Sequence, residues 1–220
     1  MTQPHVVQRA NFLGDQVVDV LRRQIITQEL PAGSLLVESK LAEAFQVSRG
    51  PIREAIRTLT DEGLVESRGR SAAVVELTAG DIDELFTLRA SLERLGLQTA
   101  IVGRRSELDD LLNTAIERMR AAVIAEDPAE FTLADMQFHS SFGIASHHRR
   151  LADVWSKYQP TIENLLLVVN LEHDRLQTAL HAHEVLAGLI RAEQDDAALE
   201  ELASHLDNSR LRLRKVYVGS

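Results

Sequence analysis

The hydrophobic positions of the first 78 residues predict three short helices followed by a hairpin. Amphipathic helical patterns cover 14–28 and 38–45, and a third begins after Ser48 and ends near position 61. Two β-like runs follow, at 64–67 and 73–77. Three helices and a hairpin within about 65 residues are typical of a winged helix-turn-helix.

The pattern changes after Thr78, where six helical stretches follow one another and no strand-like run is found. They cover 80–102, 106–125, 129–146, 150–169, 173–193 and 195–216. Acidic residues near their starts suit the helix dipole. We therefore expect a mainly α protein. A winged helix-turn-helix at 1–78 is followed by an all-α antiparallel bundle of six or seven helices at 79–220.

Charge is distributed unevenly between these two parts. The net charge is −9, but residues 1–78 carry nine basic and ten acidic side chains, against 15 and 23 in residues 79–220. A local arginine cluster can therefore still dominate the field of the first part. The chain has no cysteine, which excludes disulfides and thiolate metal sites. With no signal peptide and no apolar run of about 20 residues, we expect a cytoplasmic protein that does not enter membranes.

The third predicted helix has the pattern of a DNA-recognition helix. Its apolar positions share one side, whereas Arg49, Arg53 and Arg57 recur every four residues and form a separate basic stripe. Such a helix can pack by one face and place arginines in the major groove, on guanine or phosphate. Ser48 is expected to cap the helix, whose free backbone N–H groups suit a phosphate. The alternative is a solvated charged face.

The sequence around this helix resembles the GntR family of transcription regulators. The resemblance rests on the runs LLVESKLA at 35–42, VSRGPIREAIRTL at 47–59 and EGLV at 62–65. Gly50 stands where the family usually has threonine, and Gly69 takes the place of the usual wing glycine. The resemblance implies binding to double-stranded operator DNA. The implied DNA-binding residues are Glu38, Ser48, Arg49, Gly50, Pro51, Arg53, Arg57, Gly69 and Arg70.

Polar residues interrupt the apolar stripes of three bundle helices. Asp135 and His139 lie within one stripe, His183 within the next and His205 at the edge of the last. Buried polar groups need partners, so these could be hydrogen-bonded core residues, with Asp135 and His139 as an ion pair. If they converge, one carboxylate and three imidazoles suit a divalent metal. We expect zinc first, with nickel, manganese or iron as alternatives.

The segment ADMQFH at 134–139 resembles the D-x-x-F-H motif of the FCD ligand-binding domain, found in the FadR subfamily of GntR regulators. The 22-residue spacing of His183 and His205 also resembles that subfamily. The resemblance implies that Asp135, His139, His183 and His205 are the metal ligands. It further implies that a bound carboxylate completes the coordination sphere.

Arg89 lies inside the apolar band of the first bundle helix, in a segment that resembles the family's L-x-x-x-R-x-x-L-E pattern. The implied role is effector binding, through a bidentate clamp on a ligand carboxylate. The alternative is an ion pair within the helix, with Glu93 four residues later.

These features together predict a homodimeric, ligand-responsive transcription regulator rather than an enzyme. We expect a repressor of a catabolic operon, released by a small carboxylate bound at the metal centre. One alternative is a sensor in which the metal itself is the signal. The other is a metal-dependent hydrolase, since such a cluster can activate water, but it would leave the DNA-reading half unexplained.

Overall fold

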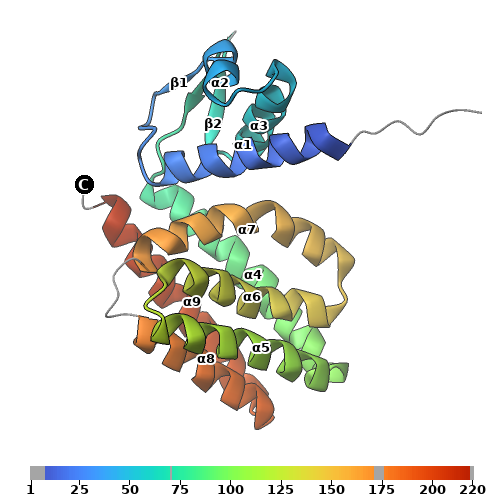
Figure 1. The fold of residues 1–220 in the computed structure, drawn as a ribbon. Helices are drawn as coiled ribbons and strands as arrows, with labels where there is room; N and C mark the ends of the chain where they lie inside the picture. The colour runs from blue at the N-terminus through green and yellow to red at the C-terminus, as the bar shows by residue number, and fades with distance from the viewer. Residues whose placement is uncertain (1–7, 70, 171–175, 219–220) are drawn as a thin grey trace, which may run out of the picture. The chain divides into compact units, whose positions relative to one another are not determined.

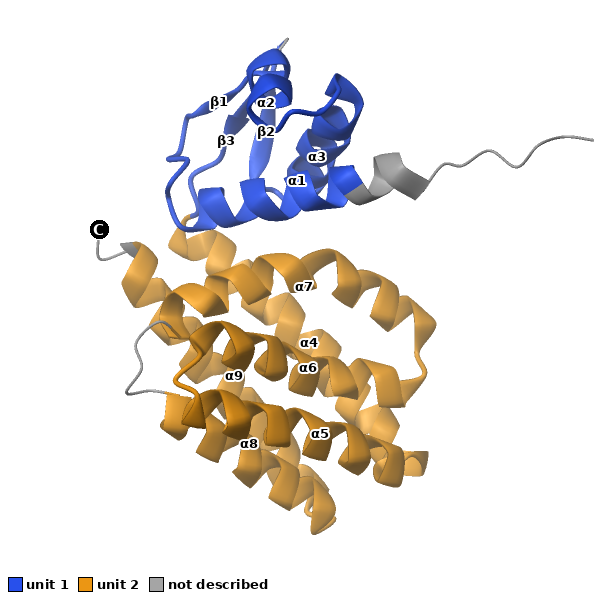
Figure 2. Ribbon diagram, in the orientation of Figure 1, with its two compact units in different colours: residues 1–77 blue, residues 78–220 orange. Residues whose placement is uncertain are grey.

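The chain folds into two compact units, residues 1–77 and 78–220 (Figure 2). The structure is a computed structural model, and the residues it describes are 8–69, 71–170 and 176–218. Each unit has a hydrophobic core of its own.

The first unit is a winged helix-turn-helix, as the sequence predicts. Within its described residues the elements run in the order α1 (Gln8–Ile26), β1 (Leu35–Leu36), α2 (Glu38–Ala44), α3 (Arg49–Asp61), β2 (Val65–Arg68) and β3 (Ser71–Val74). The strands form an antiparallel sheet in the order β1-β3-β2. Val17, Leu21, Ile52 and Leu59 from α1 and α3 are at most 3% exposed, so the two helices share the core.

The wing differs from the sequence expectation in two respects. β1 was not predicted, because two residues carry no periodicity; it forms because Leu36 is buried opposite Ala72. The second hairpin strand begins at Ser71 and ends at Val74, earlier than the expected 73–77. Gly69 has a φ of 65°, a conformation that favours glycine. It therefore turns the chain tightly between Arg68 and Ser71, which are paired across the hairpin.

The second unit consists of six helices within the described residues, in agreement with the expected bundle. They are α4 (Ala79–Gly103), α5 (Arg105–Ile124), α6 (Pro128–Ser146), α7 (Arg149–Asn170), α8 (Leu176–Arg191) and α9 (Asp195–Val218). Two of these helices have N-termini that are capped by side chains. The Thr78 and Asp81 side chains form a capping box on α4, and Asp127 caps α6 ahead of Pro128. Among the described residues, none of the helices contains an apolar stretch that could span a bilayer.

Helix α6 lies at the centre of this unit. It packs against α4, α5 and α7, and Figure 1 shows it between α5 and α7 with α4 and α9 behind. The approach of α4 is close at Gly96, where an added Cβ would lie 3.0 Å from the backbone carbonyl of Phe142. One turn before each of these residues, the same crossing brings Glu93 of α4 next to His139 of α6.

Candidate metal centre and DNA-binding helix

Helix α3 has the two faces that the sequence predicts. Ile52, Ala55 and Leu59 are fully buried, and Pro51 is buried beside them in the first turn. Three arginines, Arg49, Arg53 and Arg57, are exposed. The buried face fixes the helix in the unit, so the arginines project from a rigid support, as a recognition helix requires.

Ser48 lies at the N-cap position of α3, but its side chain makes no capping hydrogen bond. The expectation of a side-chain cap is therefore wrong in its detail. The consequence is that the N–H groups of the first turn are not satisfied by this serine and stay available to an anion. Gly50 has open space around it, since an added Cβ would meet only the Ser48 hydroxyl, 3.9 Å away.

An ion pair joins the two helices of the helix-turn-helix. The Arg53 Nε donates to Glu38 Oε2 at 2.8 Å, and the Arg53 side chain remains largely exposed whereas that of Glu38 is partly buried. They border a hollow of about 350 Å³ that is also lined by Arg57 and by Gly69 of the wing. The structure thus gathers four predicted DNA-binding residues around one hollow. Arg70, also predicted to bind DNA, lies outside the described residues.

The four predicted metal ligands come together in the second unit. His183 Nε2 lies 3.3 Å from His139 Nε2, and His205 Nε2 lies 3.2 Å from the same atom. The Asp135 carboxylate oxygen Oδ1 lies 3.2 Å from Nε2 of both His139 and His183. All four residues are buried. Helices α6, α8 and α9 therefore direct one oxygen and three nitrogens at one point.

Hydrogen bonds on the far side of two rings determine which nitrogen faces this point. His183 Nδ1 donates to the carbonyl of Ala179 at 2.7 Å, and His139 Nδ1 bonds to Glu93 Oε2 at 2.5 Å. A carbonyl cannot donate, so the neutral His183 ring carries its proton on Nδ1 and presents a lone pair on Nε2. Partners of this kind are typical of histidines that ligate metals.

The charges of the cluster follow from burial and from mutual contact. Burial opposes ionisation of Asp135, but the charge of His183 and hydrogen bonds from His139 and His183 outweigh it and hold the pKa of Asp135 well below its usual range. Burial and the charges of His183 and His139 lower the pKa of His205 well below normal. The ionised Asp135 and the neutral His205 are in the forms that bind metal. His139 and His183, which donate to Asp135 in this arrangement, would each have to release the Nε2 proton before that nitrogen could bind a metal.

Arg89 is fully buried on α4, and its guanidinium is only partly paired. Its Nε donates to Glu93 Oε1 at 2.6 Å, which confirms the ion pair within the helix. Its other two nitrogens, Nη1 and Nη2, have no hydrogen-bond partner among the described residues. Buried donors of this kind are costly to leave unpaired, so the arginine is suited to receive an anionic ligand.

Glu93 is the residue whose role at the cluster the sequence reasoning missed. The sequence indicates it only as a partner of Arg89, yet its second oxygen contacts His139. Burial raises the pKa of Glu93, but the charges of His139 and Arg89 more than offset this and lower it. The available signal was its position four residues after Arg89, on the buried face of the same helix.

Two family descriptions match the chain and cover both units. Residues 13–75 match bacterial regulatory proteins of the gntR family, and residues 84–208 match the FCD domain. This chain belongs to the GntR family. With an FCD domain after the helix-turn-helix, it has the FadR-type architecture that the sequence motifs indicate.

Relatives of this GntR-family protein include repressors of sugar-acid operons. It is 26% identical to the gluconate operon transcriptional repressor of Bacillus licheniformis, over 94% of this chain and 87% of the relative. It is 25% identical to the galactonate operon transcriptional repressor of Escherichia coli, over 92% of this chain and 97% of the relative. Both alignments span the two units.

Solved structures share the fold over nearly the full length. A GntR transcriptional regulator from Rhodococcus sp. RHA1 matches with a TM-score of 0.71 and 23% identity, covering 91% of this chain and 96% of that one. E. coli McbR/YncC matches with a TM-score of 0.74 and 19% identity, covering 93% and 98%. Because the identities are low, these likenesses support the fold alone.

Proposed function

We propose that this GntR-family regulator is a homodimeric repressor of an operon for the breakdown of a sugar acid. It binds a near-palindromic operator through α3 and the wing, and it is released when a small polyhydroxy carboxylate binds at a metal centre. That centre consists of Asp135, His139, His183 and His205, with Arg89 beside it. The observation that carries the proposal is the convergence of these four donors next to a half-paired buried arginine.

The spacing of the donor atoms supports a metal at this point. The Nε2 atoms of His139 and His183 are 3.3 Å apart, and both rings direct their Nδ1 atoms at acceptors elsewhere. Two lone pairs at this distance repel unless a cation or a proton lies between them. A tetrahedral ion with metal–nitrogen bonds of about 2.0–2.1 Å separates its nitrogens by about 3.3 Å. Zinc therefore fits the site, and the bound ion would supply positive charge for a ligand carboxylate.

Arg89 supports a carboxylate as the effector. A guanidinium can hold a carboxylate through two parallel hydrogen bonds, and Nη1 and Nη2 are the two donors of Arg89 that lack partners among the described residues. Gluconate and galactonate, which appear in the names of two relatives, each carry one carboxylate and several hydroxyls. A ligand of this class can use its carboxylate on Arg89 and the metal together.

The test begins with selection of duplexes from a random DNA library on the immobilised protein. Fluorescence anisotropy then measures the Kd of an enriched duplex with EDTA, with Zn²⁺, and with Zn²⁺ plus D-gluconate. D-sorbitol, which lacks the carboxylate, serves as the matched control. Allosteric coupling of about 1–3 kcal/mol corresponds to a 5- to 150-fold change in affinity. We expect D-gluconate to raise the Kd within this range and sorbitol to leave it unchanged.

The same experiment distinguishes the proposed function from the alternative hypotheses. If Zn²⁺ alone changes the Kd and gluconate adds nothing, the protein is a metal sensor. If no duplex is enriched, operator binding is wrong. If metal is absent by elemental analysis and cannot be loaded, the metal centre is wrong while operator binding stands.

A further inference from the structure

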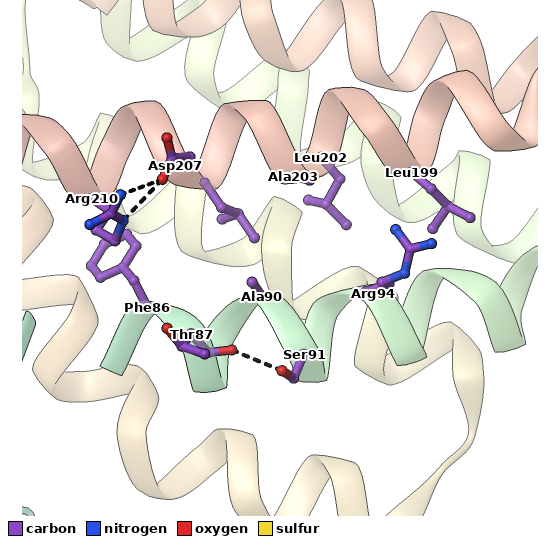
Figure 3. Close-up of a pocket in the computed structure, with 11 residues that line it drawn as sticks. Phe86, Thr87, Ala90, Ser91, Arg94, Leu199, Leu202, Ala203, Asp207 and Arg210 are labelled. Atoms are coloured by element: carbon purple, nitrogen blue, oxygen red, sulfur yellow. Dashed lines mark hydrogen bonds and ion pairs between the residues drawn. The ribbon is translucent and has the colours of Figure 1, made fainter. Parts of the chain in front are cut away.

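A cleft of about 310 Å³ lies between α4 and α9 (Figure 3). Its apolar wall is formed by Phe86 and Ala90 of α4 and by Leu199, Leu202 and Leu206 of α9. None of the four candidate metal ligands lines it, nor does Arg89. The cleft is therefore separate from the effector site proposed above.

The two ends of the cleft carry different charge. At one end Arg210 is bound to Asp207 at 2.6 Å and also contacts Asp83, so its charge is neutralised. At the other end Arg94 extends from α4 toward α9 near Leu199 (Figure 3). Arg94 is exposed and has no hydrogen bond or ion pair among the residues that the structure describes. Among the described residues that line the cleft, Arg94 is thus the one unpaired positive charge that an occupant can contact.

The depth of the leucines restricts what can occupy the cleft. Leu199, Leu202 and Leu206 are only 8%, 1% and 2% exposed. They therefore form the floor of the cleft, and an occupant can contact each of them over a small area only. A volume of about 310 Å³ also lies at the lower end for small-molecule pockets. This volume suits a small molecule better than a helix.

We propose that this cleft binds a small amphipathic monocarboxylate, with its carboxylate on Arg94 and its alkyl body against Leu199, Leu202 and Leu206. Removal of the alkyl chain from water contributes most of the binding free energy, and the single free cation selects the anionic end. The FCD-type domain then has two ligand sites, one for a polyhydroxy acid at the metal and one for an apolar acid between α4 and α9.

Isothermal titration calorimetry of the full chain with octanoate tests this, with 1-octanol as the uncharged analogue. Ala203→Trp fills the cleft from an exposed position on its edge, and Arg94→Gln removes the cation. Ser204→Trp places the same bulk on an exposed neighbour that does not line the cleft, and Arg104→Gln removes an exposed arginine near the end of α4. Circular dichroism confirms that each variant is folded.

We expect octanoate to bind at least about tenfold more tightly than 1-octanol, a difference of about 1.4 kcal/mol. Ala203→Trp abolishes binding, Arg94→Gln weakens it to the level of octanol, and both controls leave it unchanged. The proposal is overturned if octanoate does not bind, or if it binds Ala203→Trp as it binds the unmodified chain. It is also overturned if His139→Ala abolishes binding while the cleft variants do not, because octanoate then occupies the metal centre. A change of oligomeric state in Ala203→Trp with intact octanoate binding would instead identify the cleft as an interface between copies.

Discussion

His139 and Glu93 are joined by a hydrogen bond of 2.5 Å between Nδ1 and Oε2, buried between α6 and α4. The other oxygen of Glu93 accepts from Arg89 at 2.6 Å. One carboxylate therefore orients a candidate metal ligand and a candidate effector-binding arginine at the same time. A ligand that displaces Arg89 would also disturb the contact between Glu93 and His139. The proposed effector-binding arginine and the proposed metal site are therefore linked through this carboxylate.

The first prediction concerns this link. Glu93→Gln leaves an amide that can accept through only one oxygen, so His139 and Arg89 cannot both keep their bonds. Loss of such a partner typically costs 10- to 100-fold in metal affinity. We expect a fall of this size in Zn²⁺ affinity, measured by competition with a chromogenic chelator. Glu84→Gln, an exposed carboxylate on the same helix, is the control, and equal affinity in both variants would contradict the role of Glu93.

Arg89→Lys tests the effector clamp. Lysine keeps a positive charge near Glu93 but lacks the second pair of donors that the guanidinium presents. We expect operator affinity without effector and Zn²⁺ affinity to change little, whereas the D-gluconate concentration for half-release rises about tenfold or more. Anisotropy titrations on the selected duplex measure this. A normal gluconate response in Arg89→Lys would exclude a bidentate contact to Arg89.

Arg53→Ala tests the recognition helix. The Arg53 side chain is 65% exposed and pairs only with the partly exposed Glu38 among the described residues, so its loss should not affect folding. A lost bidentate base contact costs about 1–3 kcal/mol, and we expect operator Kd to rise by about 5- to 150-fold. Arg149 is an exposed arginine in the second unit, and the control variant Arg149→Ala should bind the operator with unchanged affinity. Unchanged operator affinity of Arg53→Ala would exclude this arginine from DNA reading.

Gly96→Ala tests the close crossing of α4 and α6. Its methyl group would lie 3.0 Å from the Phe142 carbonyl, so the helices must separate, at a cost of about 1–3 kcal/mol. The displacement should also weaken Zn²⁺ binding, because Glu93 and His139 lie one turn from the contact. Gly188→Ala on α8 meets no atom within 4 Å and should be neutral or stabilising, since alanine favours helices. Thermal unfolding of both variants, with Zn²⁺ titrations, distinguishes the two effects.

Much of this molecule follows from local pattern. The spacing of apolar residues gave the helices of both units because burial on one face of a helix imposes a 3.6-residue period. The same reasoning missed β1 and misplaced the second wing strand. Both depend on pairing between Leu36 and Ala72, which lie far apart in the chain, and pairing of this kind leaves no local period.

The sequence by itself determined the candidate chemistry: an arginine stripe on α3, an acid and three histidines on apolar faces, and an arginine four residues before a glutamate. Tertiary structure alone decided which of these meet. Packing of α6, α8 and α9 directs three Nε2 atoms at one point, and the glycine contact at Gly96 lets Glu93 reach His139. Packing of α4 against α9 also leaves Arg94 beside an apolar cleft, with no partner among the described residues. Helix periodicity fixes the face on which a residue lies, but distances between helices depend on how the side chains of all of them pack.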